Sequence, residues 1–266
     1  MIRERKFMKK INRYADEKQS RVILALDISK EIPVNREKWD SYKKELLKKA
    51  IDVLKLTADY IVAVKINRQM VLPLGLTDRL PELLDIATDL DILKIMDAKI
   101  NDVGHTNTWI AKHYFSVGFD AIIANPFVGW KGAMEHVFDE AGNDRGVILL
   151  TYMSHPGAIE GYGLKCSNES KTKTLYQIFA SRAIEWNADG VIVGATHIEK
   201  LSEISQMLKN KVDIYSPGIG AQGGSLELAF KNGCDFGIIG RAIFQSKDPQ
   251  QAAYEFKKVT QKFFYT

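Results

Sequence analysis

The chain alternates between short apolar runs and longer segments in which apolar residues recur every three or four positions. The runs are typical of strands in a parallel sheet whose two faces are both buried. They span residues 21–26, 60–66, 91–99, 121–124, 146–152, 191–193, 212–215 and 236–239. We therefore expect eight strands, each ending where polar residues return.

The segments between the runs have the spacing of amphipathic helices. In residues 37–58, Leu46, Ala50 and Leu54 share one side among lysines. Further helices are predicted over 103–117, 129–140, 171–187, 197–209, 223–232 and 248–263. Eight strands alternating with helices predict an α/β protein, a single-domain (β/α)8 TIM barrel over residues 21–266. A doubly wound open sheet stays possible, but it seldom needs eight evenly spaced repeats.

Composition narrows the classes of protein that fit. The 266 residues are 45% hydrophobic and 26% charged, which is ordinary globular composition. The net charge of +4 is small, and no basic block is interleaved with aromatics, so we expect no nucleic-acid partner. No apolar run approaches the roughly 20 residues of a membrane span. Cys166 and Cys234 lack C-x-x-C spacing, and no secretory segment is evident, so we expect a reduced, cytoplasmic protein.

Residues 1–20 form a polar leader ahead of the first strand. Its basic residues are Arg3, Arg5, Lys6, Lys9 and Lys10. These residues could belong to a frayed arm, to a helix over the barrel floor, or to a charged surface that only aids solubility. We expect the last of these.

Polar residues recur where the predicted strands end, which is the face on which barrel enzymes build their active sites. They are Asp27, Lys65, Asp97, Lys99, Asn125, Ser154, Thr196, residues 216–224, Gly240 and Arg241. Asp97 and Lys99 are two apart in a strand and are therefore expected on the same side, with Asp102 about a turn further on. Charges this close perturb one another's protonation, as at catalytic sites, although an ordinary ion pair in a loop also fits.

Two of these strand ends predict a phosphate site. Residues 216–224 read S-P-G-I-G-A-Q-G-G, and Gly240-Arg241 begins a helical turn after the last strand. Backbone N–H groups and an arginine at these positions suit phosphate. Glycines that only make tight turns are the alternative. The long polar connection over residues 154–171 is expected to be a nonhelical, mobile lid, and the connection over 65–80 is the next candidate.

A metal site is not expected. The histidines show no ligand spacing such as H-x-x-x-H; they are His105, His113, His136, His155 and His197. A Mg²⁺ site on Asp27 and Asp97 is conceivable, but Lys65 and Lys99 would already compensate these carboxylates. Ser154 lacks the base of a nucleophile motif, so we expect it to donate or accept hydrogen bonds.

The chain resembles the orotidine 5'-monophosphate decarboxylase family, in its compact archaeal and bacterial form, from Arg21 to the last helix. The family signature D-x-K-x-x-D stands at residues 97–102, followed by Thr106 and Asn107. Further matches in the same order are residues 26–27, 64–66, 153–157, 193–196, 216–224 and 239–241. Departures are Val103-Gly104, where many members read Ile-Pro, and Asn67, where glycine is frequent. They put the loop geometry in doubt more than the charged residues.

The resemblance implies a cofactor-free decarboxylase of orotidine 5'-monophosphate in de novo pyrimidine biosynthesis. It implies four catalytic residues, with Lys99 donating a proton to C6: Lys65, Asp97, Lys99 and Asp102. It implies that Asp27 and Lys65 bind the ribose, and that Ser154 and Pro217 contact the pyrimidine. It implies that Gln222, Gly240 and Arg241 hold the phosphate. It implies a homodimer in which Asp102 and Thr106 reach the partner's site.

Two other functions remain open. A Mg²⁺-dependent sugar-phosphate decarboxylase or aldolase of the same superfamily carries a metal-associated acid on the second strand, where this chain has Lys65. A barrel that binds a nucleotide phosphate without catalysis is the second alternative.

Overall fold

The parallel strands close into a barrel in the computed structural model, which describes residues 3–168 and 171–264. Around the barrel the strand order is β1-β10-β9-β8-β5-β4-β3-β2. The bounds are β1 (Val22–Leu26), β2 (Ala63–Asn67), β3 (Leu93–Ile100), β4 (Ala121–Ala124), β5 (Gly146–Tyr152), β8 (Gly190–Val193), β9 (Asp213–Ser216) and β10 (Phe236–Ile239). The eight apolar runs thus form the eight barrel strands, and the predicted fold is confirmed.

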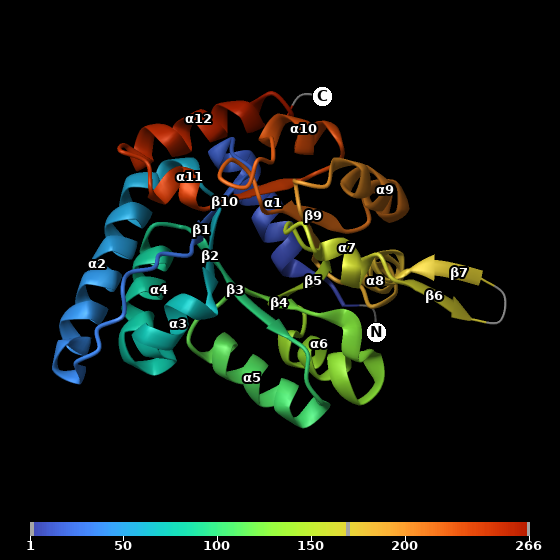
Figure 1. Cartoon of the computed structure of the whole chain (residues 1–266), viewed down its shortest axis with the longest axis horizontal. Coiled ribbons are helices and arrows are strands. Elements are labelled where there is room, and N and C mark those ends of the chain that lie inside the picture. The colour runs from blue at the N-terminus through green and yellow to red at the C-terminus, as the bar shows by residue number, and fades with distance from the viewer. Residues whose placement is uncertain (1–2, 169–170, 265–266) are drawn as a thin grey trace.

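Helices surround the barrel (Figure 1). They are α1 (Lys6–Lys18), α2 (Trp39–Thr57), α3 (Arg68–Leu74), α4 (Leu80–Asp89), α5 (Gly104–Ser116), α6 (Glu135–Ala141), α7 (Ala158–Tyr162), α8 (Leu175–Glu185), α9 (Ile198–Leu208), α10 (Leu226–Lys231), α11 (Arg241–Phe244) and α12 (Pro249–Gln261). Short 3₁₀ or π turns are η1 (Arg36–Lys38), η2 (Ala58–Tyr60), η3 (Gly75–Arg79), η4 (Pro126–Val128) and η5 (Trp130–Met134).

Each barrel strand is buried on both faces because its side chains alternate between two cores. In β1, Ile23 and Ala25 point into the barrel, whereas Val22, Leu24 and Leu26 pack against the outer helices. The unbroken apolar runs of the sequence therefore supply both the barrel interior and the layer beneath the helices.

Both connections expected as lids contain more regular structure than predicted. Residues 65–80 are largely helical in α3 and η3, and the idea that this connection acts as a lid stays a prediction. The connection over 154–171 contains α7 and an antiparallel hairpin of β6 (Lys165–Asn168) and β7 (Lys171–Thr174). This hairpin projects from the body of the molecule (Figure 1) and replaces the first four residues of a helix predicted from residue 171.

Helix α1 closes the floor of the barrel. Phe7 and Ile11 are at most 1% exposed and belong to the core inside the barrel. The fit is tight at Gly146, where an added Cβ would lie 2.4 Å from Cδ1 of Phe7. The leader therefore forms a helix over the barrel floor, and the prediction that its basic residues only aid solubility is wrong. The division of the chain at residue 20 stays a prediction.

Aspartates at the starts of strands hold the same floor together. Oδ2 of Asp189 accepts the backbone N–H of Val147 at 2.8 Å, and Oδ2 of Asp235 accepts that of Ile214 at 2.7 Å. Asp189 also pairs with the Arg3 guanidinium at 2.6 Å. Each carboxylate thus joins neighbouring strands, and one of them anchors the leader.

Among the described residues, no helix is long and apolar enough to cross a membrane.

Candidate active site

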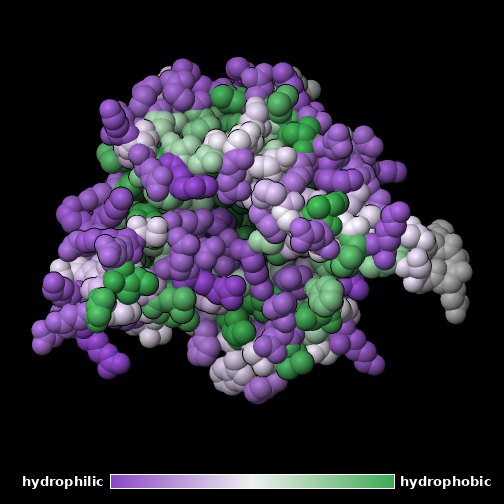
Figure 2. All heavy atoms as spheres, viewed as in Figure 1, coloured by the Kyte–Doolittle hydropathy of each residue, from purple (hydrophilic) through white to green (hydrophobic). Residues whose placement is uncertain are grey.

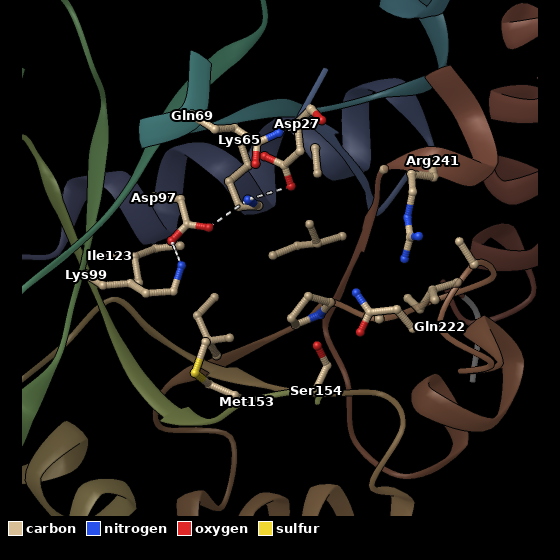
Figure 3. Close-up of a pocket in the computed structure, with 18 of the residues that line it drawn as sticks. Asp27, Lys65, Gln69, Asp97, Lys99, Ile123, Met153, Ser154, Gln222 and Arg241 are labelled. Atoms are coloured by element: carbon tan, nitrogen blue, oxygen red, sulfur yellow. Dashed lines mark hydrogen bonds and ion pairs between the residues drawn. The ribbon is translucent and has the colours of Figure 1, made fainter. Parts of the chain in front are cut away.

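A cavity of about 390 Å³ opens on the barrel face formed by the C-terminal ends of the strands. Hydrophilic side chains surround the central hollow of this face (Figure 2). The close-up in Figure 3 places Asp97 and Lys99 on one side of the cavity and Gln222 and Arg241 on another. The cavity lining includes nine of the residues singled out in the sequence: Asp27, Lys65, Asp97, Lys99, Ser154, Pro217, Gln222, Gly240 and Arg241.

Four charged side chains form a chain of alternating sign along one wall. Nζ of Lys65 lies 3.5 Å from Oδ2 of Asp27 and 2.7 Å from Oδ2 of Asp97. Nζ of Lys99 lies 2.5 Å from Oδ1 of Asp97. The order is therefore Asp27, Lys65, Asp97, Lys99, contributed by the ends of β1, β2 and β3. Asp97 stands at the centre, with an ammonium group on each carboxylate oxygen.

The electrostatics of this wall fix the charge of Asp97. Burial alone would raise the pKa of its carboxyl, but the Lys65 and Lys99 ammonium groups outweigh burial and lower the pKa to about 2. Burial likewise tends to lower the pKa of Lys65, but Asp97 and Asp27 outweigh it and the pKa is raised. At neutral pH both groups are therefore charged, although their side chains are only 6% and 8% exposed.

Lys99 reaches the cavity through an unusual backbone conformation. Its φ of 51° lies in the left-handed region, which costs an L-residue about 1–2 kcal/mol. The ladder between β3 and β4 shifts register between Met96 and Ile100, and it resumes at Ile100 opposite Ala124. Simple alternation is therefore not the reason that Lys99 and Asp97 meet, although the prediction that they share a side is confirmed. Strain of this kind is concentrated at functional sites.

The predicted phosphate site lies away from the charged wall. Gln222 lies within the glycine loop after β9, and Arg241 begins α11 after β10 (Figure 3). Gly218 (φ 94°) and Gly220 (φ 72°) adopt conformations that favour glycine. An added Cβ on Gly218 would lie 2.9 Å from Cβ of Ser154, so the loop can pass close to the strand-five end only with glycine there.

Ser154 is held by the loop after β8. The Thr196 hydroxyl donates to the backbone carbonyl of Ser154 at 2.7 Å. Gly194 lies so close that an added Cβ would be 2.5 Å from Cα of Ser154. These contacts fix the backbone while the Ser154 side chain points toward the cavity near Gln222 (Figure 3).

Sequence reasoning missed two groups of cavity residues. Ile123, Leu150 and Ile192 form an apolar wall, and their inward position at the strand ends was the available signal. Gln69 also lines the cavity and donates from Nε2 to the Asp27 carbonyl at 2.7 Å. No pattern in the sequence singled out Gln69, because it belongs to a segment expected to be an open loop.

Asp102 and Thr106 are not part of this cavity's lining. Asp102 is exposed beyond the end of β3, and Thr106 lies in the first turn of α5. Among the described residues, no group of three or more His, Cys, Asp or Glu side chains is placed to hold a metal ion.

Comparison with known proteins gives a consistent result. Residues 20–256 match the model of the orotidine 5'-phosphate decarboxylase / HUMPS family. Orotidine 5'-phosphate decarboxylase of Thermococcus kodakarensis is 36% identical over 235 residues, which cover 88% of this chain and 94% of that protein.

Solved structures resemble the chain over similar spans. Orotidine 5'-monophosphate decarboxylase from Methanocaldococcus jannaschii, complexed with inhibitor BMP, has a TM-score of 0.72 and 28% identity, covering 91% of this chain and 98% of that chain. The OMP decarboxylase of Leishmania donovani has a TM-score of 0.82 at 22% identity, covering 98% and 99%. The second likeness concerns the fold alone.

Proposed function

The chain belongs to the orotidine 5'-phosphate decarboxylase / HUMPS family, and from this premise we propose that it converts orotidine 5'-monophosphate to uridine 5'-monophosphate and CO₂ without a cofactor. The observation that carries the proposal is the buried sequence of charges Asp27, Lys65, Asp97 and Lys99. The reaction belongs to pyrimidine biosynthesis.

We propose that the parts of the nucleotide lie in separate places in the cavity. Arg241, with Gln222 and Gly240, would bind the phosphate, since a guanidinium and a helix start both favour that anion. Asp27 and Lys65 would bind the ribose hydroxyls, and Ser154 and Pro217 would contact the pyrimidine. The carboxylate and C6 then face Asp97 and Lys99.

The chemistry follows from the charges. The bond between C6 and the carboxylate carbon breaks, CO₂ leaves, and the electron pair stays on C6. The Lys99 ammonium stabilises this pair and gives it a proton, and the resulting amine regains a proton from water. Asp97, with its pKa of about 2, remains ionised beside the substrate carboxylate. Its negative charge therefore favours the loss of the like-charged group, a form of ground-state destabilisation whose importance is debated.

The apolar wall supports the same step. Ile123, Leu150 and Ile192 can solvate neutral CO₂ better than a carboxylate, because burying a charge among hydrocarbon is costly. As the carboxylate loses its charge, contact with these side chains becomes favourable. The wall thus stabilises the transition state more than the bound substrate.

A homodimer is part of the proposal. Asp102 and Thr106 would complete the site of a second subunit. Large apolar side chains near them on the same chain are exposed, among them Val103 at 64%, Trp109 at 51% and Phe127 at 65%. Burial of such side chains between two copies is a favourable way to remove them from water.

We also propose a cytoplasmic location. Cys166 and Cys234 are both free, as is usual in a reducing compartment.

The test is decarboxylation of orotidine 5'-monophosphate in the presence of EDTA, followed by the loss of orotate absorbance. Turnover unaffected by EDTA supports the proposal. No turnover of this nucleotide, with Mg²⁺-dependent turnover of a sugar phosphate instead, would favour a sugar-phosphate enzyme of the family. Nucleotide binding without turnover would favour a noncatalytic barrel. The Lys65 ammonium, paired with two carboxylates, argues against a cation at that position.

A further inference from the structure

The loop after β3 is shaped by a buried amide. Asn107 lies in the first turn of α5 and is fully buried. Its Oδ1 accepts the backbone N–H of Asp102 at 3.1 Å, and its Nδ2 donates to the backbone carbonyl of Asp102 at 2.6 Å. The same Nδ2 donates to the carbonyl of Ala133 in η5 at 3.1 Å. Both donor hydrogens and the acceptor of the amide are therefore used.

These bonds fix the backbone of one residue on both sides. The N–H and the carbonyl of Asp102 are both held by Asn107, so the peptide groups flanking its Cα have little freedom to rotate. The Asp102 carboxylate adds a local bond, since its Oδ1 accepts the backbone N–H of Val103 at 2.7 Å. The side chain is nevertheless exposed and absent from the cavity of its own chain.

A second contact holds the same loop from the side of α6. The His136 imidazole packs on Gly104, where an added Cβ would lie 2.3 Å from Cδ2 of His136. This contact accounts for Gly104, at which the sequence departs from the usual family pattern. The loop is thus held by α5, η5 and α6, which are elements of a single subunit.

From this geometry we infer that Asn107 is a positioning residue for decarboxylation, presenting Asp102 in a fixed place to the active site of the partner subunit. The inference rests on the proposed function and on the homodimer. Asn107 does not touch substrate; it acts through the backbone of Asp102. Loss of the amide would allow Asp102 to move, and displacement of a catalytic group by about 1 Å can cost about 10²-fold in rate.

The experiment uses mixed dimers. Lys99→Ala and Asn107→Ala subunits carrying different affinity tags are co-expressed, and dimers with one of each are purified. In such a dimer, one site has an intact Lys99 from the Asn107→Ala subunit and a properly held Asp102 from the other. We expect the Asn107→Ala homodimer to lose about 10²-fold in kcat/KM and the mixed dimer to recover about half of the wild-type activity per dimer.

Two controls make the result specific. Ser116→Ala removes a hydroxyl at the far end of α5 that donates to the His113 carbonyl and does not touch the loop that carries Asp102, so it should keep wild-type activity. A mixed dimer of Lys99→Ala and Asp102→Asn should recover activity like the Asn107 pair. If Asn107→Ala subunits do not accumulate, Asn107→Asp, which keeps the size and the acceptor, takes their place.

A mixed dimer no more active than the Asn107→Ala homodimer would overturn the inference, because Asn107 would then act within its own subunit. Failure of the Asp102 pair to recover activity would overturn it as well. Failure of the proposed function is distinguishable, because in that case the wild-type protein itself does not turn over orotidine 5'-monophosphate.

Discussion

Nζ of Lys65 lies 2.7 Å from Oδ2 of Asp97, and both side chains are more than nine-tenths buried. Neither charge could stay in this position alone, because an unpaired buried ion is far less stable than a hydrated one. The pair therefore joins the C-terminal ends of β2 and β3 and places two charged groups in the active-site cavity. Its stability and its reactivity can be measured separately.

Asp97→Asn should destabilise the fold, because it leaves the ammonium groups of Lys65 and Lys99 without their shared counter-charge. We expect a loss of about 3 kcal/mol in the free energy of unfolding at pH 7, measured with urea. Asp52→Asn is the matched control, since Asp52 forms a 2.6 Å pair with Lys48 on the surface and should lose less than about 1 kcal/mol. Equal losses in the two variants would contradict this account.

The same pair predicts a dependence on pH. Because the pKa of Asp97 is lowered to about 2 in the folded protein, the unfolded chain takes up this proton first as the pH falls. The contribution of Asp97 to stability is complete above about pH 4 and is lost as the pH falls toward 2. Over this pH range, the free energy of unfolding should fall less steeply with falling pH for Asp97→Asn than for the wild type. The same slope in both proteins would contradict the lowered pKa of Asp97.

The left-handed backbone at Lys99 predicts that glycine is better tolerated there than alanine. Both Lys99→Gly and Lys99→Ala remove the ammonium group, but only alanine keeps a Cβ at a φ of 51°. We expect Lys99→Gly to be more stable than Lys99→Ala by about 1 kcal/mol. At an ordinary strand position glycine would be the less stable of the two, so the order of the two midpoints in urea decides the matter.

At the barrel floor, Gly146→Ala should destabilise the protein by roughly 2 kcal/mol, because the new methyl group meets the Phe7 ring. The effect should be smaller when Phe7 is already alanine, and the part that stays reflects Cβ of Ala121, 2.8 Å from the added methyl group. A double-mutant cycle on the free energy of unfolding measures this coupling. If the two losses simply add, α1 does not fill the barrel in the way described.

Asp213 predicts the opposite dependence on pH from Asp97. Burial, reinforced by the nearby charge of Asp235, raises the pKa of Asp213 to about 7, and its Oδ2 accepts a hydrogen bond from Asn12 of α1 at 2.8 Å. The folded protein therefore keeps a proton that the unfolded chain loses near pH 4, and stability falls as the pH rises from about 4 to 7.

Asp213→Asn removes this titration. The free energy of unfolding of the variant minus that of the wild type should be more positive at pH 8 than at pH 5, as measured by unfolding in urea at both pH values. The same difference at the two pH values would show that Asp213 does not titrate in this range.

Much of the fold could be predicted because a strand buried on both faces leaves an unbroken apolar run. Such runs predicted all eight barrel strands, and the polar residues at or just after their C-terminal ends included Asp27, Lys65 and Arg241 of the cavity. The helices over residues 65–80 were not predicted, because polar residues such as Asn67 and Gln69 are typical of a loop in sequence. Asn67 in fact ends β2 and caps the N-terminus of α3, where its side chain accepts the Gln69 N–H at 3.2 Å.

Other features depend on tertiary contacts that no local pattern records. The burial of Phe7 depends on the space left by Gly146, more than a hundred residues away in the chain. The orientation of Lys99 depends on the register of β3 against β4, and the role of Asn107 on the backbone of Asp102. The sequence shows which kinds of side chain stand at these positions, but it does not show which residues they contact in the folded chain.

The most direct test of the central claim is the decarboxylation rate of Lys99→Ala, measured beside its affinity for uridine 5'-monophosphate. Lys99 is assigned both the stabilisation of charge at C6 and the delivery of the proton, so we expect kcat to fall by about 10⁴-fold or more. Nucleotide binding should change by less than about tenfold, because Arg241 and Gln222 remain to hold the phosphate. Decarboxylation at a near-normal rate by this variant would contradict the account.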